Sequence, residues 1–219
     1  MIPSRLHLLL SLFSLPAALG LPGFGAVRLA LDAAPKAATV AQACPEGSSS
    51  HSVDSVSFFL ESGIKMTTGS CAPSNSTLAA RAARGAVASS PLPDGREPGD
   101  ECDTPCKTVC FDGHKSPDAA DCQVIFDALL TRDDRQFCLH RTDGFVLYTF
   151  KSCGTSFTNQ IVGSDEPQPL NYCYRDWAGA GHWVANACQS DSEAAGGKCV
   201  AAFGSFQDVP DWYMQVYNT

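Results

Sequence analysis

The chain has 219 residues, and its 15 basic and 23 acidic residues give a net charge of −8. Residues 102–219 carry eight Lys or Arg against fifteen Asp or Glu, without a basic cluster. This field repels phosphate backbones, so neither nucleic acid nor an anionic membrane surface is an expected partner.

Residues 1–20 have the three parts of a secretory signal peptide. Arg5 gives a positive start, residues 6–15 are mostly apolar, and Ala18 and Gly20 are small residues suited to cleavage. A membrane anchor needs about 20 continuous apolar residues, whereas Pro16 interrupts this run, and no later segment is long enough. We therefore expect a secreted, extracellular protein with no membrane span.

Eleven cysteines are distributed unevenly along the chain, with two before residue 102 and nine from residue 102 onward. In a secreted chain this density predicts a disulfide framework, and the odd total leaves at least one cysteine free or bonded to another molecule. Spacing alone does not define the connectivity. The disulfide candidates are Cys44, Cys71, Cys102, Cys106, Cys110, Cys122, Cys138, Cys153, Cys173, Cys188 and Cys199.

Residues 21–71 form an N-terminal segment in which alternating apolar residues at 56, 58 and 60 predict a short strand. A turn at 61–63 would lead into a second strand at 64–68. Either a Cys44–Cys71 bridge closes this small hairpin, or both cysteines bond elsewhere.

Residues 72–101 are rich in Ala, Ser, Pro, Gly and Arg and have almost no large apolar side chain. Such a segment cannot bury enough surface to offset its ordering entropy, which predicts a disordered linker. Asn75 begins an N-glycosylation acceptor, Asn-Ser-Thr. Arg81 and Arg84 offer alternative processing sites, but the absence of a dibasic pair favours a plain linker.

The first helix of the C-terminal domain, residues 102–219, is expected to begin at Ser116. Ser116 can cap a helix, Pro117 suits the first helical position, and Asp118 and Asp121 complement the positive end of the helix dipole. Its apolar stripe consists of Cys122, Ile125, Phe126 and Leu129.

Strands are predicted at 135–140 and 145–151, joined as a hairpin by the Asp143-Gly144 turn. Residues 155–162 add a short edge strand. An apolar stripe from Tyr174 to Cys188 predicts the second helix, in which Gly179 and Gly181 would let it lie close to the sheet. Two more strands follow at 198–203 and 212–217.

This order predicts an α+β two-layer sandwich, stapled by disulfides, in which two helices cover one face of an antiparallel sheet of four to five strands. Cys173 and Cys188, at the two ends of one helix, would be about 22 Å apart and cannot bond each other. A bridge from Cys122 to Cys153 is our hypothesis for a staple between helix and sheet.

Candidate chemistry is sparse. Cys102, Cys106, Cys110 and His114 recur every four residues and resemble a zinc ligand set, but helical spacing would spread them over about 18 Å, and in a secreted chain disulfides are favoured. No phosphate loop, dinucleotide motif or nucleophile elbow is present in the sequence. We therefore expect no catalytic residue, cofactor or metal.

His114, His140 and His182 are expected at the surface. The alternative is a small secreted hydrolase or nuclease in which His140 is paired with Asp143 or Asp176.

Three aromatic residues are candidate partner contacts. Trp183 is off the stripe of the second helix, and Tyr213 and Tyr217 alternate with the core-facing Trp212. Exposed together, they would bind a protein or a glycan; the alternative is that they are scattered.

Several segments together resemble the extracellular protein 2 effector domain of fungi, over about residues 110–217. They are Cys110, Ser116-Pro117-Asp118-Ala119-Ala120-Asp121-Cys122, Ser152-Cys153 with Phe157, Gly197-Lys198-Cys199, and Asp211-Trp212-Tyr213-Met214-Gln215-Val216-Tyr217. Cys138, Cys173, Cys188 and the N-terminal segment depart from the family pattern.

The resemblance implies a secreted, necrosis-inducing or virulence effector with a fold similar to the viral killer toxins of smut fungi. Such a protein acts by binding a host or competitor target, and no catalysis is expected. The alternatives are a secreted hydrolase or ribonuclease and a structural protein of the cell wall.

Overall fold

The computed structural model describes residues 42–44, 51–59, 62–72, 99–161, 168–189, 194–202 and 210–219. All of them belong to one unit, Ala33–Thr219. The predicted signal peptide, nearly all of the predicted linker and Asn75 lie outside the described residues.

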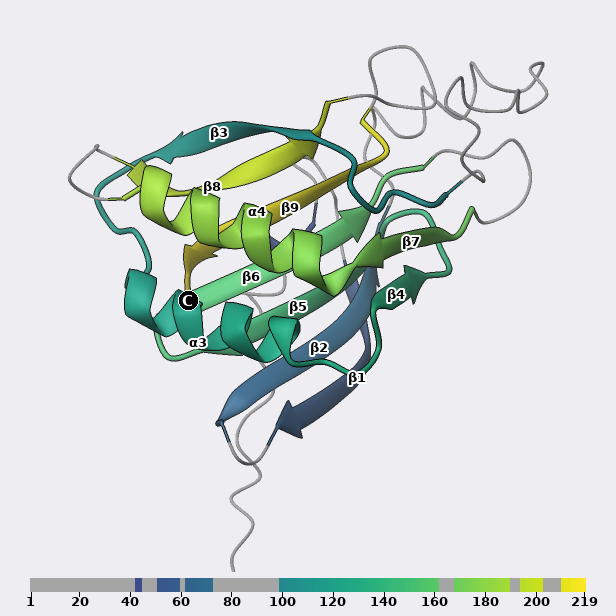
Figure 1. Ribbon diagram of the computed structural model, residues 1–219, viewed down its shortest axis with the longest axis horizontal. Coiled ribbons are helices and arrows are strands. Elements are labelled where there is room, and N and C mark those ends of the chain that lie inside the picture. Colours follow the sequence, from purple (N-terminus) through teal and green to yellow (C-terminus); the bar gives the residue numbers. More distant parts are fainter. Residues whose placement is uncertain are drawn as a thin grey trace, which may run out of the picture. The chain divides into compact units, whose positions relative to one another are not determined.

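The fold is α+β and is built on a seven-stranded antiparallel sheet in the order β1-β2-β5-β6-β9-β8-β3 (Figure 1). A separate two-stranded antiparallel sheet pairs β4 with β7. The strands of the large sheet are β1 (His51–Phe59), β2 (Ile64–Cys71), β3 (Cys106–Asp112), β5 (Gly144–Phe150), β6 (Cys153–Asn159), β8 (Ala194–Ala201) and β9 (Trp212–Asn218). The small sheet consists of β4 (Gln136–Leu139) and β7 (Leu170–Cys173).

The large sheet exceeds the predicted four to five strands because the N-terminal hairpin joins it and because residues 106–112, where no strand was predicted, form β3. β1 and β2 form the predicted antiparallel hairpin, and β2 then pairs with β5 from Lys65↔Thr149 to Ser70↔Gly144. β6 is also not the predicted edge strand. It lies between β5 and β9, and all seven of its residues are buried.

The predicted hairpin between residues 135–140 and 145–151 is wrong, because β4 pairs with β7 and β5 pairs with β2 and β6. The chain instead turns a corner between the two sheets at Asp143, which is buried and has a φ of 61°. Asn159 stabilises this corner. Its Nδ2 donates to the carbonyls of Leu139, Arg141 and Gln168 at 3.2, 3.0 and 2.8 Å.

Both predicted helices are present, α3 (Ala119–Leu130) and α4 (Tyr174–Ala187), and both cover one face of the large sheet (Figure 1). The buried residues of α3 are the predicted stripe. The helix start differs from the prediction, because Asp118 rather than Ser116 is the N-cap. Its carboxylate accepts a hydrogen bond from the N–H of Ala120 at 2.8 Å, which satisfies one of the unpaired N–H groups of the first turn.

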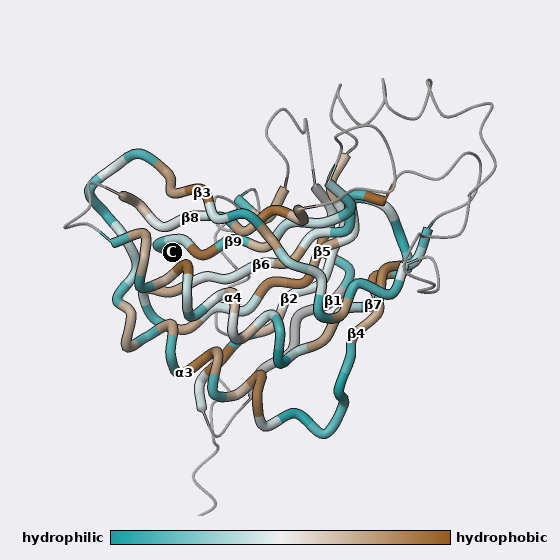
Figure 2. Tube along the Cα trace, turned by 45° about the horizontal axis from the view of Figure 1, so that its top comes forward, coloured by the Kyte–Doolittle hydropathy of each residue, from teal (hydrophilic) through white to brown (hydrophobic). Residues whose placement is uncertain are grey.

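An aromatic core fills the space between the helices and the sheets. Trp177 of α4 lies 5.3 Å from Phe137 of β4 and 5.7 Å from Phe157 of β6, measured between ring centroids. Its indole N–H donates to Thr155 Oγ1 at 3.1 Å, so burial leaves it hydrogen-bonded. By contrast with this apolar core, the connection from α3 to β4 consists of hydrophilic residues, as Figure 2 shows.

The opposite face of the large sheet is covered in part by residues 42–44. Ala43 is fully buried, and its carbonyl accepts from Thr158 Oγ1 at 2.8 Å and from the Tyr213 hydroxyl at 3.1 Å. The Cys44–Cys71 disulfide fixes this segment to β2.

Five disulfides link the described part of the chain, and Cys138 is its free cysteine. They are Cys44–Cys71, Cys102–Cys173, Cys106–Cys199, Cys110–Cys188 and Cys122–Cys153. The staple between Cys122 and Cys153 is confirmed, and of the two readings of the N-terminal hairpin the structure has the bridged one. In the described segments, neither helix has the length and apolarity needed to cross a membrane.

Candidate functional site

α4 is held at both ends by disulfides. Cys173, its N-cap residue, bonds Cys102, and Cys188, its C-cap residue, bonds Cys110. The expectation that Cys173 and Cys188 do not bond each other is confirmed. Because each end is joined covalently to a different part of the chain, α4 cannot shift or unwind without moving its attachments.

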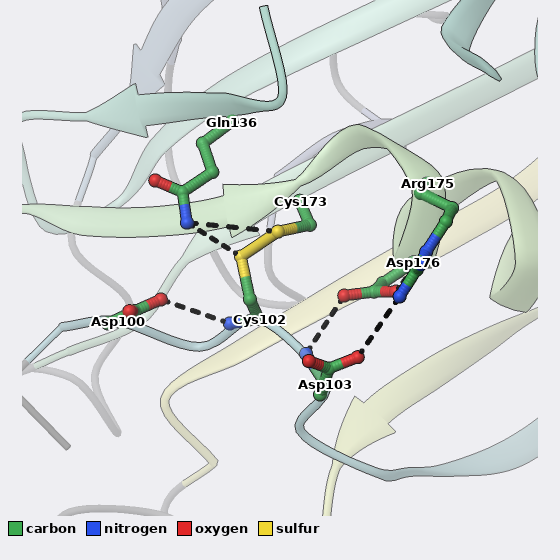
Figure 3. Close-up of polar contacts among 7 residues, drawn as sticks. All are labelled: Asp100, Cys102, Asp103, Gln136, Cys173, Arg175 and Asp176. Carbon is green, nitrogen blue, oxygen red and sulfur yellow. Dashed lines mark hydrogen bonds and ion pairs between the residues drawn. A yellow bond between two sulfur atoms is a disulfide. The ribbon is translucent and has the colours of Figure 1, made fainter.

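Polar contacts strengthen the N-terminal attachment (Figure 3). The carboxylate of Asp176, in the first turn, accepts from the N–H of Asp103 at 2.8 Å, and Arg175 lies 3.5 Å from the Asp103 carboxylate. The amide of Gln136 donates to Cys102 Sγ at 3.1 Å. The Cys102–Cys173 disulfide therefore lies between β4 and the start of α4.

These contacts do not form a metal site. Cys102, Cys173 and Asp176 bring one ligand atom each to within 4.8 Å of one another, but both sulfurs are in the disulfide. The zinc alternative drawn from the four-residue spacing is also wrong, because Cys102, Cys106 and Cys110 are all disulfide-bonded.

The outward face of α4 presents Trp183, whose exposed fraction is 64%. Gly179, one turn before it, has no atom within 4 Å of an added Cβ, so the surface beside the indole is open. Asn186, one turn after it, is exposed, and its amide donates to the carbonyl of His182 at 2.7 Å. The face therefore combines one large aromatic ring with small and polar neighbours.

The structure does not place Tyr213 and Tyr217 beside Trp183. They are 5% and 3% exposed, so the prediction that the three aromatics are exposed together is wrong for both tyrosines. They face the side of the sheet that Ala43 covers, and burial raises the pKa of each hydroxyl. The predicted alternation along the strand is confirmed, but no local pattern in the sequence indicates that this second face of the sheet is also covered.

The glycines of α4 have different roles from the one predicted. Gly181 lies against α3 rather than against the sheet, because a Cβ at this position would lie 2.3 Å from Cε1 of Phe126. Gly179 faces solvent.

Two segments that carry the family resemblance meet in space. Ser152 Oγ donates to the Asp121 carboxylate at 2.8 Å, and the disulfide between the next two residues, Cys122 and Cys153, lies alongside. Lys151 Nζ is 3.3 Å from the same carboxylate. The hydrogen bond from Ser152, followed by the contacts of Lys151, holds the pKa of Asp121 below its ordinary value. The Ser152–Asp121 hydrogen bond and the Cys122–Cys153 disulfide thus join the start of α3 to the turn between β5 and β6.

His114, His140 and His182 are all exposed, as expected. Nδ1 of His140, the residue directly after β4, lies 3.5 Å from Sγ of the free Cys138. Burial raises the pKa of the Cys138 thiol, which is the opposite of the activation expected of a nucleophile. Asp176, which the hydrolase alternative pairs with His140, instead accepts a hydrogen bond from the backbone N–H of Asp103.

Sequence reasoning missed two features of this region. The amide of Asn159 is buried and bridges three carbonyls, and nothing near it in the sequence indicates those partners. The Cys138–His140 contact could have been found, because residues two apart on a strand share a face.

A scan against models of known protein families finds no match to this chain, and a search of curated proteins finds none either.

Proposed function

We propose that this protein is a secreted, cysteine-rich, toxin-like effector that binds a host or competitor protein or glycan through the outward face of α4. The observation that carries the proposal is the exposed Trp183 on a helix attached at both ends by disulfides. The motif resemblance to fungal effector domains, the five disulfides and the signal-like residues 1–20 support the same reading.

Rigid presentation of a tryptophan favours binding for two reasons. An indole buries a large area for few rotatable bonds, and tryptophan is enriched among residues that dominate binding energies. A helix that is already fixed loses little further conformational entropy in a complex. Trp183 is thus the residue of this face that we expect to contribute most to affinity.

The size of that contribution follows from area. A tryptophan side chain buries about 150–250 Å², and at about 25 cal/mol per Å² the exposed part of Trp183 corresponds to about 3 kcal/mol. Truncation to alanine should therefore weaken binding by at least about 2 kcal/mol, or about 30-fold.

The experiment compares Trp183→Ala with Leu130→Ala. Leu130, at the end of α3, is 55% exposed and serves as a matched apolar control. Purified proteins are infiltrated into plant leaf tissue and added to competing microbes, and cell death or growth arrest is scored over a dilution series. Wild type and Leu130→Ala should be active, whereas Trp183→Ala should need about 30 times more protein.

Equal activity of Trp183→Ala and wild type would contradict the proposed binding face. Loss of activity in a folded His140→Ala variant, with Trp183→Ala unaffected, would favour the alternative of a secreted hydrolase or ribonuclease. Inactivity of the wild type in both assays, together with firm retention on cell-wall material, would favour the structural alternative.

A further inference from the structure

The disulfides divide the fold into two parts that no disulfide joins. Cys44–Cys71 closes within the N-terminal part, residues 42–72, whereas the other four bridges join residues between 102 and 199. Cys138 is free, so all eleven cysteines are accounted for within the described residues. The backbone between residues 72 and 99 is therefore the covalent connection between the N-terminal part and the rest of the fold.

The N-terminal part lies at one end of the large sheet (Figure 1). β2 pairs with β5 over six residue pairs, from Lys65↔Thr149 to Ser70↔Gly144. Because β1 and β2 are the last two strands on that side, their departure would shorten the sheet without dividing it. β5 would then be an edge strand with unpaired N–H and C=O groups.

The N-terminal part also shields an apolar face of the sheet. Ala43 and Cys71 form one buried cluster with Phe145, Leu147 and Tyr217, and Phe145 and Leu147 are fully buried in it. Departure of the N-terminal part would expose these side chains beside the free edge of β5. A strand edge next to an apolar face is the geometry at which an extended peptide adds to a sheet, with main-chain hydrogen bonds for affinity and alternate side chains for specificity.

The contribution of the N-terminal part to the main core is small. Among its described side chains, the buried ones are Ala43, Ile64, Thr67 and Cys71, and only Ile64 is a large apolar residue. The disulfides of the other part hold both helices and β3, and none of them involves the N-terminal part. The framework that fixes the helices to the sheet therefore does not depend on residues 42–72.

We propose that residues 42–72 are a detachable cover of a strand-binding site at β5. Once the backbone is cut between residues 72 and 99, non-covalent contacts alone hold the cover, and another extended segment with alternating apolar side chains can replace it. While the backbone is intact, the cover has an effective concentration on the order of 1 mM, so a competitor at about 10 μM is at a roughly 100-fold disadvantage. This control does not depend on binding through Trp183.

The experiment uses the full chain with the recognition sequence of a specific protease inserted between residues 84 and 85, folded before it is cut. The probe is a synthetic peptide of residues 42–72 with the Cys44–Cys71 bond formed and a fluorophore at its N-terminus. The cut protein should give two fragments in denaturing electrophoresis without reductant, but one mass in solution. With about 10 μM probe, it should bind roughly 100 times more of the peptide than the uncut protein.

Three variants locate the uptake. Lys65 and Thr149 are opposite each other in register, so Lys65→Cys with Thr149→Cys should lock β2 to β5 by a disulfide, and after cutting this variant should take up no probe. Tyr213→Phe removes a hydroxyl that donates to the carbonyl of Ala43 at 3.1 Å and should weaken probe binding about fivefold. Tyr172→Phe removes a hydroxyl of the small sheet and should bind the probe as wild type does.

Several results would overturn the proposal. Failure of the cut protein to take up probe, even in urea too dilute to change its circular dichroism, would show that the cover does not leave. Equal uptake by cut and uncut protein would show that the backbone connection does not control the site. Uptake by the locked variant would place the probe elsewhere than at β5. If the locked variant does not fold, equal probe affinities of Tyr213→Phe and wild type would lead to the same conclusion.

Discussion

Two glycines one half-turn apart on α4 should respond in opposite ways to the same substitution. Replacing an exposed helical glycine by alanine stabilises a helix by about 0.8–1.0 kcal/mol. At Gly179 nothing lies within 4 Å of the new Cβ, so Gly179→Ala should gain the whole amount.

At Gly181 the same gain is opposed by a collision. The new Cβ would lie 2.3 Å from Cε1 and 2.6 Å from Cζ of Phe126, whereas carbon atoms pack at about 3.5–4.0 Å. Overpacking of this kind costs about 1–3 kcal/mol. Because the helix propensity gain is common to both variants, it cancels in their difference. Gly181→Ala should therefore be about 1–3 kcal/mol less stable than Gly179→Ala.

Urea unfolding without reductant, followed by circular dichroism, measures both free energies against wild type. The m-value should stay constant, so that the shift in midpoint reports stability. Adding Phe126→Leu to Gly181→Ala should recover part of the loss, because the shorter side chain makes room for the methyl group. Equal stability of the two alanine variants, or no coupling to Phe126→Leu, would refute the assigned contact between α3 and α4.

Three further predictions concern the attachments of the sheet. Replacing Cys122 and Cys153 by alanine opens a loop with a sequence separation of 31 residues, and the loop-entropy model gives a loss of about 3.7 kcal/mol in chemical unfolding. Asn159→Ala leaves three carbonyls without their amide donor and should cost at least about 3 kcal/mol, whereas a loss below 1 kcal/mol would contradict the bridging role. The pKa of Asp121 is lowered chiefly by Ser152, so its stabilisation is present above the ordinary value of 3.8 and is lost as the pH falls through the lowered value. When melting temperatures are measured over a pH series, Ser152→Ala should reduce the loss of stability at acid pH. An unchanged slope would show that the hydrogen bond between Ser152 and Asp121 is not the cause of that loss.

The two helices were predictable because their signal is local. The apolar stripes of α3 and α4 recur within one segment, and the same periodicity correctly left Trp183 outside the core. The cap of α3 was misplaced by two residues, since both Ser116 and Asp118 are good capping residues and only backbone geometry distinguishes them.

The sheet was less predictable because its determinants are distant in sequence. β6 appears polar, yet Thr155 and Thr158 are buried because their hydroxyls donate to the carbonyls of Gln215 and Ala43. No local pattern around β6 indicates those acceptors. The same long-range contact at Ala43 buries Tyr213, which explains why exposure was predicted correctly for Trp183 on the helix and wrongly for Tyr213 on the strand.

The position of β9 has a consequence for biosynthesis. It follows every other described strand along the chain, yet it lies in the sheet between β6 and β8. During translation the two parts of the sheet therefore cannot join until residues 212–218 leave the ribosome. In the secreted protein proposed above, Cys102, Cys106 and Cys110 would enter an oxidising compartment 71, 93 and 78 residues before their partners, and Cys122, Cys138 and Cys153 would arrive before those partners. Any bond formed among these early cysteines other than Cys122–Cys153 has to be exchanged before the final pairing is reached, so we expect production to depend on a disulfide isomerase more than on an oxidant.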